Sequence, residues 1–148
     1  MQDLPYSLMT ELEKVVGRDL PPVAVWQPEV EKDIDMEVLP DGTWNYMGTP
    51  IIRRRLIHLF ASVLRKEGDD YFLVTPLEKC RIRVLDVPFQ IILMNVIGEG
   101  TLQSLEITTD MGETVVVDSE HPLRIVHRND ESIPYVMIRA GMEGRMNR

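Results

Sequence analysis

Short apolar runs separated by turn residues dominate the second half of the chain, and they limit the folds that it can adopt. Seven such runs follow residue 70: YFLVTP, CRIRVLDV, PFQIILMNVIG, LQSLEITTD, ETVVVDS, HPLRIVHR and PYVMIRAG. Runs of this kind, rich in Val, Ile and Leu and bounded by Gly, Asp, Pro or Ser, are typical of β-strands. Because the connections between them are short, we expect the strands to pair antiparallel.

Two segments of the first half carry apolar side chains at helical spacing. The first is SLMTELEKVVGRDLPP, which predicts a short helix that stops at Gly17. The second covers residues 50–66, where Thr49 can cap the helix and Pro50 suits its first position. The apolar stripe of this second helix consists of Ile52, Leu56, Leu59, Phe60 and Val63.

A β-hairpin is predicted at IDMEVLPDGTWNYMG, where apolar residues alternate on both sides of a Pro-Asp-Gly turn. A Gly turn followed by an x-Pro-aliphatic step occurs at 34–51 and again at 105–123, with spacings that differ by two residues. On these residues alone, the similarity is closer to coincidence than to a duplication. The chain thus predicts an α+β fold, with an N-terminal helix and a hairpin-helix-strand half over 1–90 and a mainly β half over 91–148.

The chain is acidic, with a formal net charge of −8, but its positive charge is concentrated in the middle. Residues 48–90 hold eight basic and five acidic side chains, whereas the segments on either side are both acidic on balance. We expect no general binding of nucleic acid, because that affinity comes from many basic side chains that meet phosphates. A local site for an anion is still compatible with this distribution.

Cys80 is the only cysteine, and the N-terminus lacks the basic start and apolar stretch of a secretory signal, so we expect a cytoplasmic location. The longest charge-free apolar stretch, at 87–98, is shorter than the about 20 residues that span a bilayer. We expect it to be a buried strand, and we expect no membrane partner. The three histidines have no spacing that suits zinc, so neither a metal nor another cofactor is predicted.

An ordered run of motifs extends over about residues 21–144. It comprises PPVAVWQP, then DGTWNYMGTPIIRRRLIHLFASVLRKEGDDYFLVTPLEKCRIRVLDVPF, then TTDMGETVVVDSEHPLRI and IPYVMIRAGME. This run resembles the bacterial family named domain of unknown function 1285. The resemblance implies a small α+β protein of two related halves, the second similar to a pleckstrin-homology barrel. It also implies a ligand or signalling site where the halves meet, without an established activity.

The family pattern implies particular residues, and the chain fits them. They are Arg53, Thr75 to Lys79, Pro88-Phe89, His121 to Arg124, Pro134-Tyr135 and Arg139. The chain departs from the pattern at Asp110 and Glu113, where the family would place an asparagine and an aspartate. The resemblance also makes duplication of the two halves the favoured interpretation.

Arg53, Arg54 and Arg55 follow the predicted start of the central helix, where the helix dipole disfavours positive charge. One interpretation of these arginines is structural. Arg54 would then be solvated, while Arg53 or Arg55 would pair with Asp35 or Glu37 across the contact between helix and sheet.

The alternative is an anion-binding site at this helix start. Gly48 would let the backbone approach the ligand, free N–H groups after Thr49 would point at it, and Arg53 would supply a two-pronged donor. Trp44 and Tyr46 lie two apart on one strand and so share a face. They form either a stacking platform beside the arginines or core beneath the helix.

Further candidates follow from the pattern and the resemblance. Glu78 and Lys79 would suit proton transfer, but adjacent strand residues point to opposite faces, which favours ion pairs instead. If the two halves meet as the family resemblance implies, Arg53, Lys79, Arg124 and Arg139 would converge on one groove and concentrate positive potential there.

We therefore expect a non-catalytic binding or signalling module, whose partner is an anionic small molecule or an acidic or phosphorylated peptide in a groove between the halves. Two alternatives stay open: a protein–protein interaction subunit, and an enzyme of unrecognised type that uses Glu78 or His121. DSEHP, at 118–122, predicts a turn, because consecutive residues cannot hold the geometry of a catalytic triad. The oligomeric state is left open by the sequence.

Overall fold

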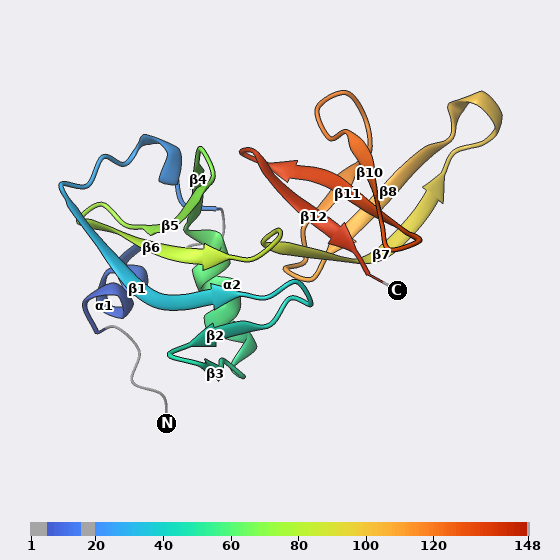
Figure 1. Ribbon diagram of the computed structural model, residues 1–148. Coiled ribbons are helices and arrows are strands. Elements are labelled where there is room, and N and C mark those ends of the chain that lie inside the picture. Colours follow the sequence, from blue (N-terminus) through green and yellow to red (C-terminus); the bar gives the residue numbers. More distant parts are fainter. Residues whose placement is uncertain (1–5, 16–19, 148) are drawn as a thin grey trace. The chain divides into compact units, whose positions relative to one another are not determined.

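The computed structural model describes residues 6–15 and 20–147 (Figure 1). The chain divides into two compact units, Met1–Asp86 and Val87–Arg148, which we call unit 1 and unit 2. Over the described residues, each unit contains a six-stranded sheet built from its own strands. Where the sequence suggested a division after residue 90, the contacts within the chain divide it between Asp86 and Val87.

Unit 1 combines a mixed sheet with two α-helices. Its elements are α1 (Tyr6–Val15), the 3-10 turn η1 (Val23–Val25), β1 (Val30–Val38), β2 (Trp44–Tyr46), β3 (Thr49–Pro50), α2 (Arg54–Ser62), β4 (Leu64–Glu67), β5 (Asp70–Val74) and β6 (Glu78–Val84). The strand order is β3-β2-β1-β6-β5-β4. β1 and β6 run parallel at the centre, while the other pairs are antiparallel.

Unit 2 is built almost entirely of strands. Its elements are β7 (Phe89–Ile97), the 3-10 turn η2 (Gly100–Leu102), β8 (Ser104–Thr109), β9 (Thr114–Val116), β10 (Leu123–Arg128), β11 (Glu131–Arg139) and β12 (Met142–Met146). The strand order is β10-β11-β12-β7-β8-β9, again with a central parallel pair, here β7 and β12.

The two sheets have the same topology, because in each the first strand lies parallel to the sixth and the flanking strands follow in the same order. The prediction of two similar halves is thus confirmed, whereas purely antiparallel pairing is wrong at the two central pairs. The described chain is mostly β, and α2 has no counterpart between β9 and β10, where residues 117–122 form a turn instead.

The similarity noted between 34–51 and 105–123 has a structural basis, but it does not match the strand order. Leu39–Thr43 and Thr109–Glu113 form turns with the same backbone bonds: Leu39 N–H to Thr43 O and Thr109 N–H to Glu113 O, both 2.8 Å. In unit 1 this turn joins the first and second strands, while in unit 2 it joins the second and third. The same turn therefore recurs at different positions of one topology.

The central helix begins later than the sequence predicts. Pro50 belongs to β3 and pairs with Asn45, and α2 starts only at Arg54, after an extended Arg53. Ile52, expected in the buried stripe, is 85% exposed. The expected end of the helix is also wrong, because residues from Leu64 onward form β4. Pairing within the sheet has overridden the local helix signals.

Each unit has a core of its own. In unit 1, the Phe60 ring of α2 stacks on the Trp44 ring of β2 with 6.2 Å between centroids, which attaches the helix to the sheet. Leu8 and Leu12 of α1 are also fully buried. In unit 2, the largest fully buried side chains are Phe89, Ile107, Tyr135, Ile138 and Met142.

Strand β7 differs from the expectation of a buried strand at 87–98. Residues Phe89–Ile91 are buried, but every residue from Ile92 to Ile97 is exposed. The β7–β8 hairpin projects from the sheet of unit 2 in Figure 1. In the described part of the chain, none of the helices is long and apolar enough to cross a membrane.

Candidate functional site

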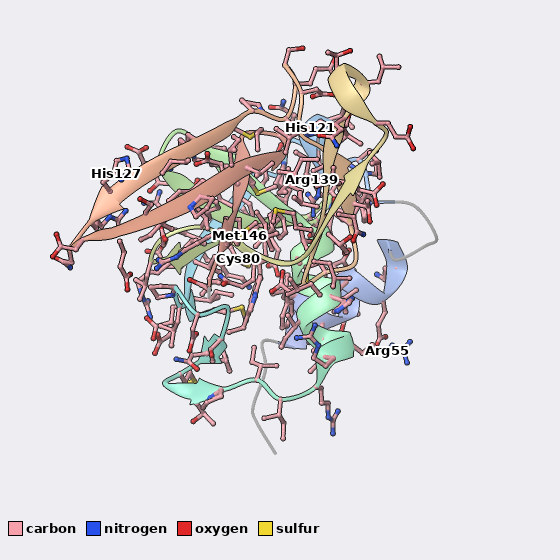
Figure 2. The ribbon with its side chains drawn as sticks, turned by 90° about the vertical axis from the view of Figure 1, so that its right-hand side faces the viewer. Arg55, Cys80, His121, His127, Arg139 and Met146 are labelled. Carbon is pink, nitrogen blue, oxygen red and sulfur yellow. The ribbon has the colours of Figure 1, made fainter. Side chains whose placement is uncertain are left out.

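The three successive arginines lie at the start of α2 with exposed side chains. Arg53 is the N-cap residue, in extended conformation, and its side chain does not cap the helix. Arg54 and Arg55 form the first turn, which contains no acidic residue. Figure 2 labels Arg55 on this helix. Positive charge is thus placed where the helix dipole is already positive, an arrangement that a bound anion would relieve.

The predicted ion pairs between these arginines and the β1 carboxylates, Asp35 and Glu37, do not form. Arg83 of β6 takes that role instead, with its Nη2 atom 2.6 Å from Asp35 Oδ1 and 3.4 Å from Glu37 Oε2. Among the described residues, Arg53 and Arg55 form no ion pair. The structural interpretation of the arginine cluster therefore fails for its predicted partners.

Gly48 and Thr49 serve the sheet rather than the helix. Met47 and Gly48 both have positive φ angles, of 51° and 79°, and they form the tight turn between β2 and β3. Thr49 pairs with Tyr46 across this turn. The expectation that the helix begins after Thr49 is wrong, because α2 begins only at Arg54.

Trp44 is a core residue and not a stacking platform. Its side chain is fully buried against Phe60, and its Nε1 atom has no hydrogen-bond partner in the described chain. Tyr46 is half-buried on the same strand. The aromatic pair therefore fits the core interpretation at Trp44.

Lys79 lies within a row of charges on the outer face of the unit 1 sheet. Its Nζ donates to Glu67 Oε1 at 2.9 Å and lies 3.4 Å from Glu31 Oε1. The ammonium group sits 4.4 Å from the centroid of the Phe72 ring. The hydrogen bond with Glu67 raises the pKa of Lys79. The positive charge of this residue is thus already matched by carboxylates.

Glu78 points to the opposite face, as the strand alternation predicts. Its side chain is buried, and Glu78 Oε2 lies 2.8 Å from Lys32 Nζ. This hydrogen bond raises the pKa of Lys32. Thr75 closes the preceding turn by accepting from the Glu78 N–H at 3.2 Å. Next on this face, burial raises the pKa of the Cys80 thiol to about 12, with the Glu78 charge as a further cause.

Arg124 and Arg139, both in unit 2, are also paired with carboxylates. Arg124 donates to both oxygens of Glu143, from Nε at 2.8 Å and from Nη2 at 2.9 Å, and lies over the Tyr135 ring. Arg139 donates from Nε to Glu113 at 3.0 and 2.9 Å. The glutamate that departs from the family pattern therefore has a defined partner. The convergence of these arginines with Arg53 and Lys79 on one groove stays a prediction.

His121 is held by its turn. Asp118 Oδ1 accepts from the N–H groups of Glu120 and His121, at 2.9 and 2.8 Å, and His121 Nδ1 lies 3.0 Å from Met137 O. His127 lies near the tip of the β10–β11 hairpin, as Figure 2 shows. No group of three or more His, Cys, Asp or Glu that could hold a metal occurs in the described part of the chain.

Sequence reasoning missed Lys32 and Arg83, although a signal for Arg83 was present. Glu31, Asp33, Asp35 and Glu37 alternate along β1, and the basic residues Lys79, Arg81 and Arg83 alternate along β6. Matching the two alternations would have placed the strands side by side with opposite charges facing each other. The pairs Arg81 with Glu31 and Arg83 with Asp35 follow from this match.

Comparison with known proteins identifies the class to which this two-unit chain belongs. Residues 21–87 match the N-terminal domain of the family of unknown function DUF1285, and residues 88–148 match its C-terminal domain. The chain belongs to the DUF1285 family. A comparison with curated proteins finds no match.

Two solved structures of this family are similar to the chain. A DUF1285 family protein from Silicibacter pomeroyi DSS-3 is 40% identical, with a TM-score of 0.88, over 95% of this chain and 78% of that one. A DUF1285 family protein from Shewanella baltica OS155 is 28% identical, with a TM-score of 0.56, over 76% of this chain and 84% of that one.

Proposed function

We propose that the chain is a non-catalytic binding module that recognises a phosphate or carboxylate group through the arginines at the start of α2. The observation that carries this proposal is the contrast among the candidate cations. Lys79, Arg124 and Arg139 each face a carboxylate within their own unit, whereas Arg53 and Arg55 form no ion pair among the described residues.

The geometry suits an oxyanion. Arg53 and Arg55 lie at the start of α2, which is the positive end of the helix dipole. Guanidinium groups bind phosphate and carboxylate through paired, charge-assisted hydrogen bonds, which are stronger than neutral ones. Because the arginines are exposed, salt should weaken this binding, and a ligand with two or more negative charges should be favoured.

The source of the anion can be a free small molecule or a side chain of a peptide, and the test separates the two. Isothermal titration with inorganic phosphate and citrate covers the small anions. A phosphoserine peptide and its unphosphorylated form cover the second source. Preference for the phosphopeptide over both its unmodified form and inorganic phosphate would identify a peptide partner.

The variant Arg53→Ala/Arg55→Ala tests the site. Each lost charged hydrogen bond should weaken binding about tenfold. The matched control is Arg128→Ala, which removes an exposed arginine of unit 2 that contacts the Tyr135 hydroxyl. Equal affinity of the double variant and the wild type would overturn the assignment, and so would a wild type that binds none of the anions.

A further inference from the structure

The longest stretch of the chain without an acidic residue surrounds the start of α2. It runs from Gly42 to Lys66, and all 24 Asp and Glu residues of the sequence lie outside it. The stretch carries five basic residues, three of which are Arg53, Arg54 and Arg55. An acidic chain thus has one long segment of positive local charge, and such a segment attracts anionic surfaces.

Two apolar side chains next to these arginines are exposed. Ile52, immediately before Arg53, is 85% exposed, and Met47, in the turn between β2 and β3, is 64% exposed. The β2–β3 hairpin lies beside the start of α2 (Figure 1), and Met47 and Ile52 are separated by at most about 18 Å of chain. Ile51 is buried, and its N–H donates to Trp44 O at 2.8 Å. This bond fixes the segment to the sheet, so that Ile52 is held at the surface.

The carboxylates of β1 next to this turn are already compensated. The Met47 N–H donates to the Asp35 carbonyl oxygen at 2.8 Å, which places the turn against β1. The Asp35 and Glu37 carboxylates both lie within 4.0 Å of the Arg83 guanidinium, at 2.6 and 3.4 Å. Their negative charge is therefore matched within the sheet, and it opposes an anionic partner of the arginines only weakly.

We propose that Met47, Ile52, Arg53 and Arg55, which we call the β3–α2 patch, bind the surface of an anionic lipid bilayer. The guanidinium groups would contact headgroup phosphates, and Ile52 and Met47 would enter the apolar layer below them. This inference rests on the proposed function, because it assigns the recognised phosphate to a lipid headgroup. The sequence prediction of no membrane partner considered only a spanning segment, which a surface contact does not need.

The exposed Ile52 favours a bilayer over a free anion. A soluble phosphate would be held by the arginines alone and would leave the isoleucine side chain in water. A bilayer offers phosphates and an apolar layer together, so both kinds of side chain contribute. Each arginine near an anionic surface should strengthen binding about fivefold, and insertion of Ile52 about tenfold. The contact should be reversible and should weaken as the salt concentration rises.

Co-sedimentation with vesicles tests this inference. The wild type should bind vesicles of equal parts phosphatidylcholine and phosphatidylglycerol, and it should not bind phosphatidylcholine alone. Ile52→Ser should bind the anionic vesicles about tenfold more weakly, with its affinity for inorganic phosphate unchanged. Ile52→Trp should bind them more tightly than the wild type, because tryptophan favours the membrane interface. The matched control is Ile125→Ser, the same change at a 52% exposed isoleucine of unit 2, which should bind as the wild type does.

The variant Arg53→Ala/Arg55→Ala separates this inference from the proposed function, because it should lose both vesicle and phosphate binding. A wild type that binds inorganic phosphate or the phosphoserine peptide but not the anionic vesicles overturns the lipid inference and leaves the proposed function in place. A wild type that binds none of these probes overturns both. Vesicle binding that neither Ile52→Ser nor the double variant weakens overturns the lipid inference as well, because another surface would then be responsible.

Discussion

Adjacent residues of one strand have separate roles in this protein, as Glu78 and Lys79 illustrate. Glu78 points to the buried face and pairs with Lys32, while Lys79 points outward to Glu67 and Glu31. Strand alternation was sufficient to predict that the two side chains separate. It could not name their partners, because Lys32 and Glu67 come from other strands and only the sheet register brings them together.

Removing Lys32 and removing Glu78 from their ion pair should lower the stability of unit 1 by different amounts. Lys32→Met leaves the buried Glu78 carboxylate without this ammonium group and should destabilise unit 1 by about 1–3 kcal/mol. Glu78→Gln leaves Lys32, whose side chain is 39% exposed and can reach water, so its cost should be smaller. Urea unfolding followed by tryptophan fluorescence measures both, and an equal cost for the two variants would contradict the argument.

Alkaline pH should destabilise unit 1 through Cys80. Burial raises the pKa of this thiol from an ordinary value of 9.0 to about 12. Between these values the unfolded thiol has lost its proton while the folded thiol keeps it, so the free energy of unfolding falls as pH rises. Lys32, whose pKa is raised above 10.5 by Glu78, adds a loss at still higher pH.

The variant Cys80→Ala isolates the thiol contribution to this pH dependence. Urea midpoints of the wild type should decline from about pH 9 upward, and those of Cys80→Ala should stay flatter up to about pH 10.5. A wild type and a variant with parallel pH profiles would show that Cys80 ionisation does not contribute.

Local signals identified most elements of the chain but set the boundaries of α2 incorrectly. The Pro-Asp-Gly turn and the alternation around it were sufficient for the hairpin of β1 and β2. Thr49 and Pro50 looked like a helix start, yet the positive φ angles of Met47 and Gly48 turn them into a strand that pairs with β2. β12 was missed because MEGRM has little strand character, and its pairing with β11 and β7 defines it.

The start of α2 should be stabilised by a change that abolishes anion binding. Arg53 is the N-cap residue but makes no capping bond, whereas aspartate is among the preferred N-cap residues. Arg53→Asp should therefore raise the stability of unit 1 by about 1 kcal/mol, by capping and by its favourable charge at this end.

The same variant should lose affinity for phosphate, so that stability and binding change in opposite directions. Thermal unfolding and isothermal titration on one sample measure both effects. A variant that is less stable than the wild type would contradict the capping argument. One that binds phosphate as tightly would contradict the proposed site.

Alanine substitutions at two turn glycines should distinguish the stability cost of backbone strain from that of a steric clash. Gly112 and Gly98 have φ angles of 87° and 84°, which other residues rarely adopt. A Cβ at Gly112 would meet no atom within 4 Å, whereas one at Gly98 would lie 2.4 Å from the Leu102 carbonyl oxygen. Gly112→Ala should cost about 1 kcal/mol and Gly98→Ala clearly more, unless the hairpin tip rearranges. Urea unfolding, with amide exchange around each turn, checks the order.

The molecule repeats one topology without repeating its sequence signals. The duplication could be recognised from the sequence only with the family resemblance, because the shared turn occupies a different hairpin in each unit. Each sheet has six strands in the same order, and its central parallel pair joins the first strand of the unit to the last. Short connections alone favoured antiparallel neighbours at both central pairs, and only the matching charge alternations of β1 and β6 point to the pairing of distant strands in unit 1.

Separate cores should allow the two units to unfold separately. Phe60→Ala removes a fully buried ring of unit 1 and should cost that unit about 3–5 kcal/mol. Both tryptophans, Trp26 and Trp44, belong to unit 1, so their fluorescence should report this loss. Amide protection in β11 should stay unchanged. The reciprocal variant Ile107→Ala should reduce protection in unit 2 and leave the fluorescence midpoint in place, whereas a common shift of both units would contradict independence.

The parallel pair of first and sixth strands also determines when each unit can fold during synthesis. About 40 residues separate the end of β1 from the start of β6, a delay of several seconds at roughly 5–20 residues per second. The nascent chain can form the β1–β2 hairpin in this interval, but its central ladder has to wait until Val84 is released. Slow codons placed shortly after β6 would give unit 1 time to close before β7 appears.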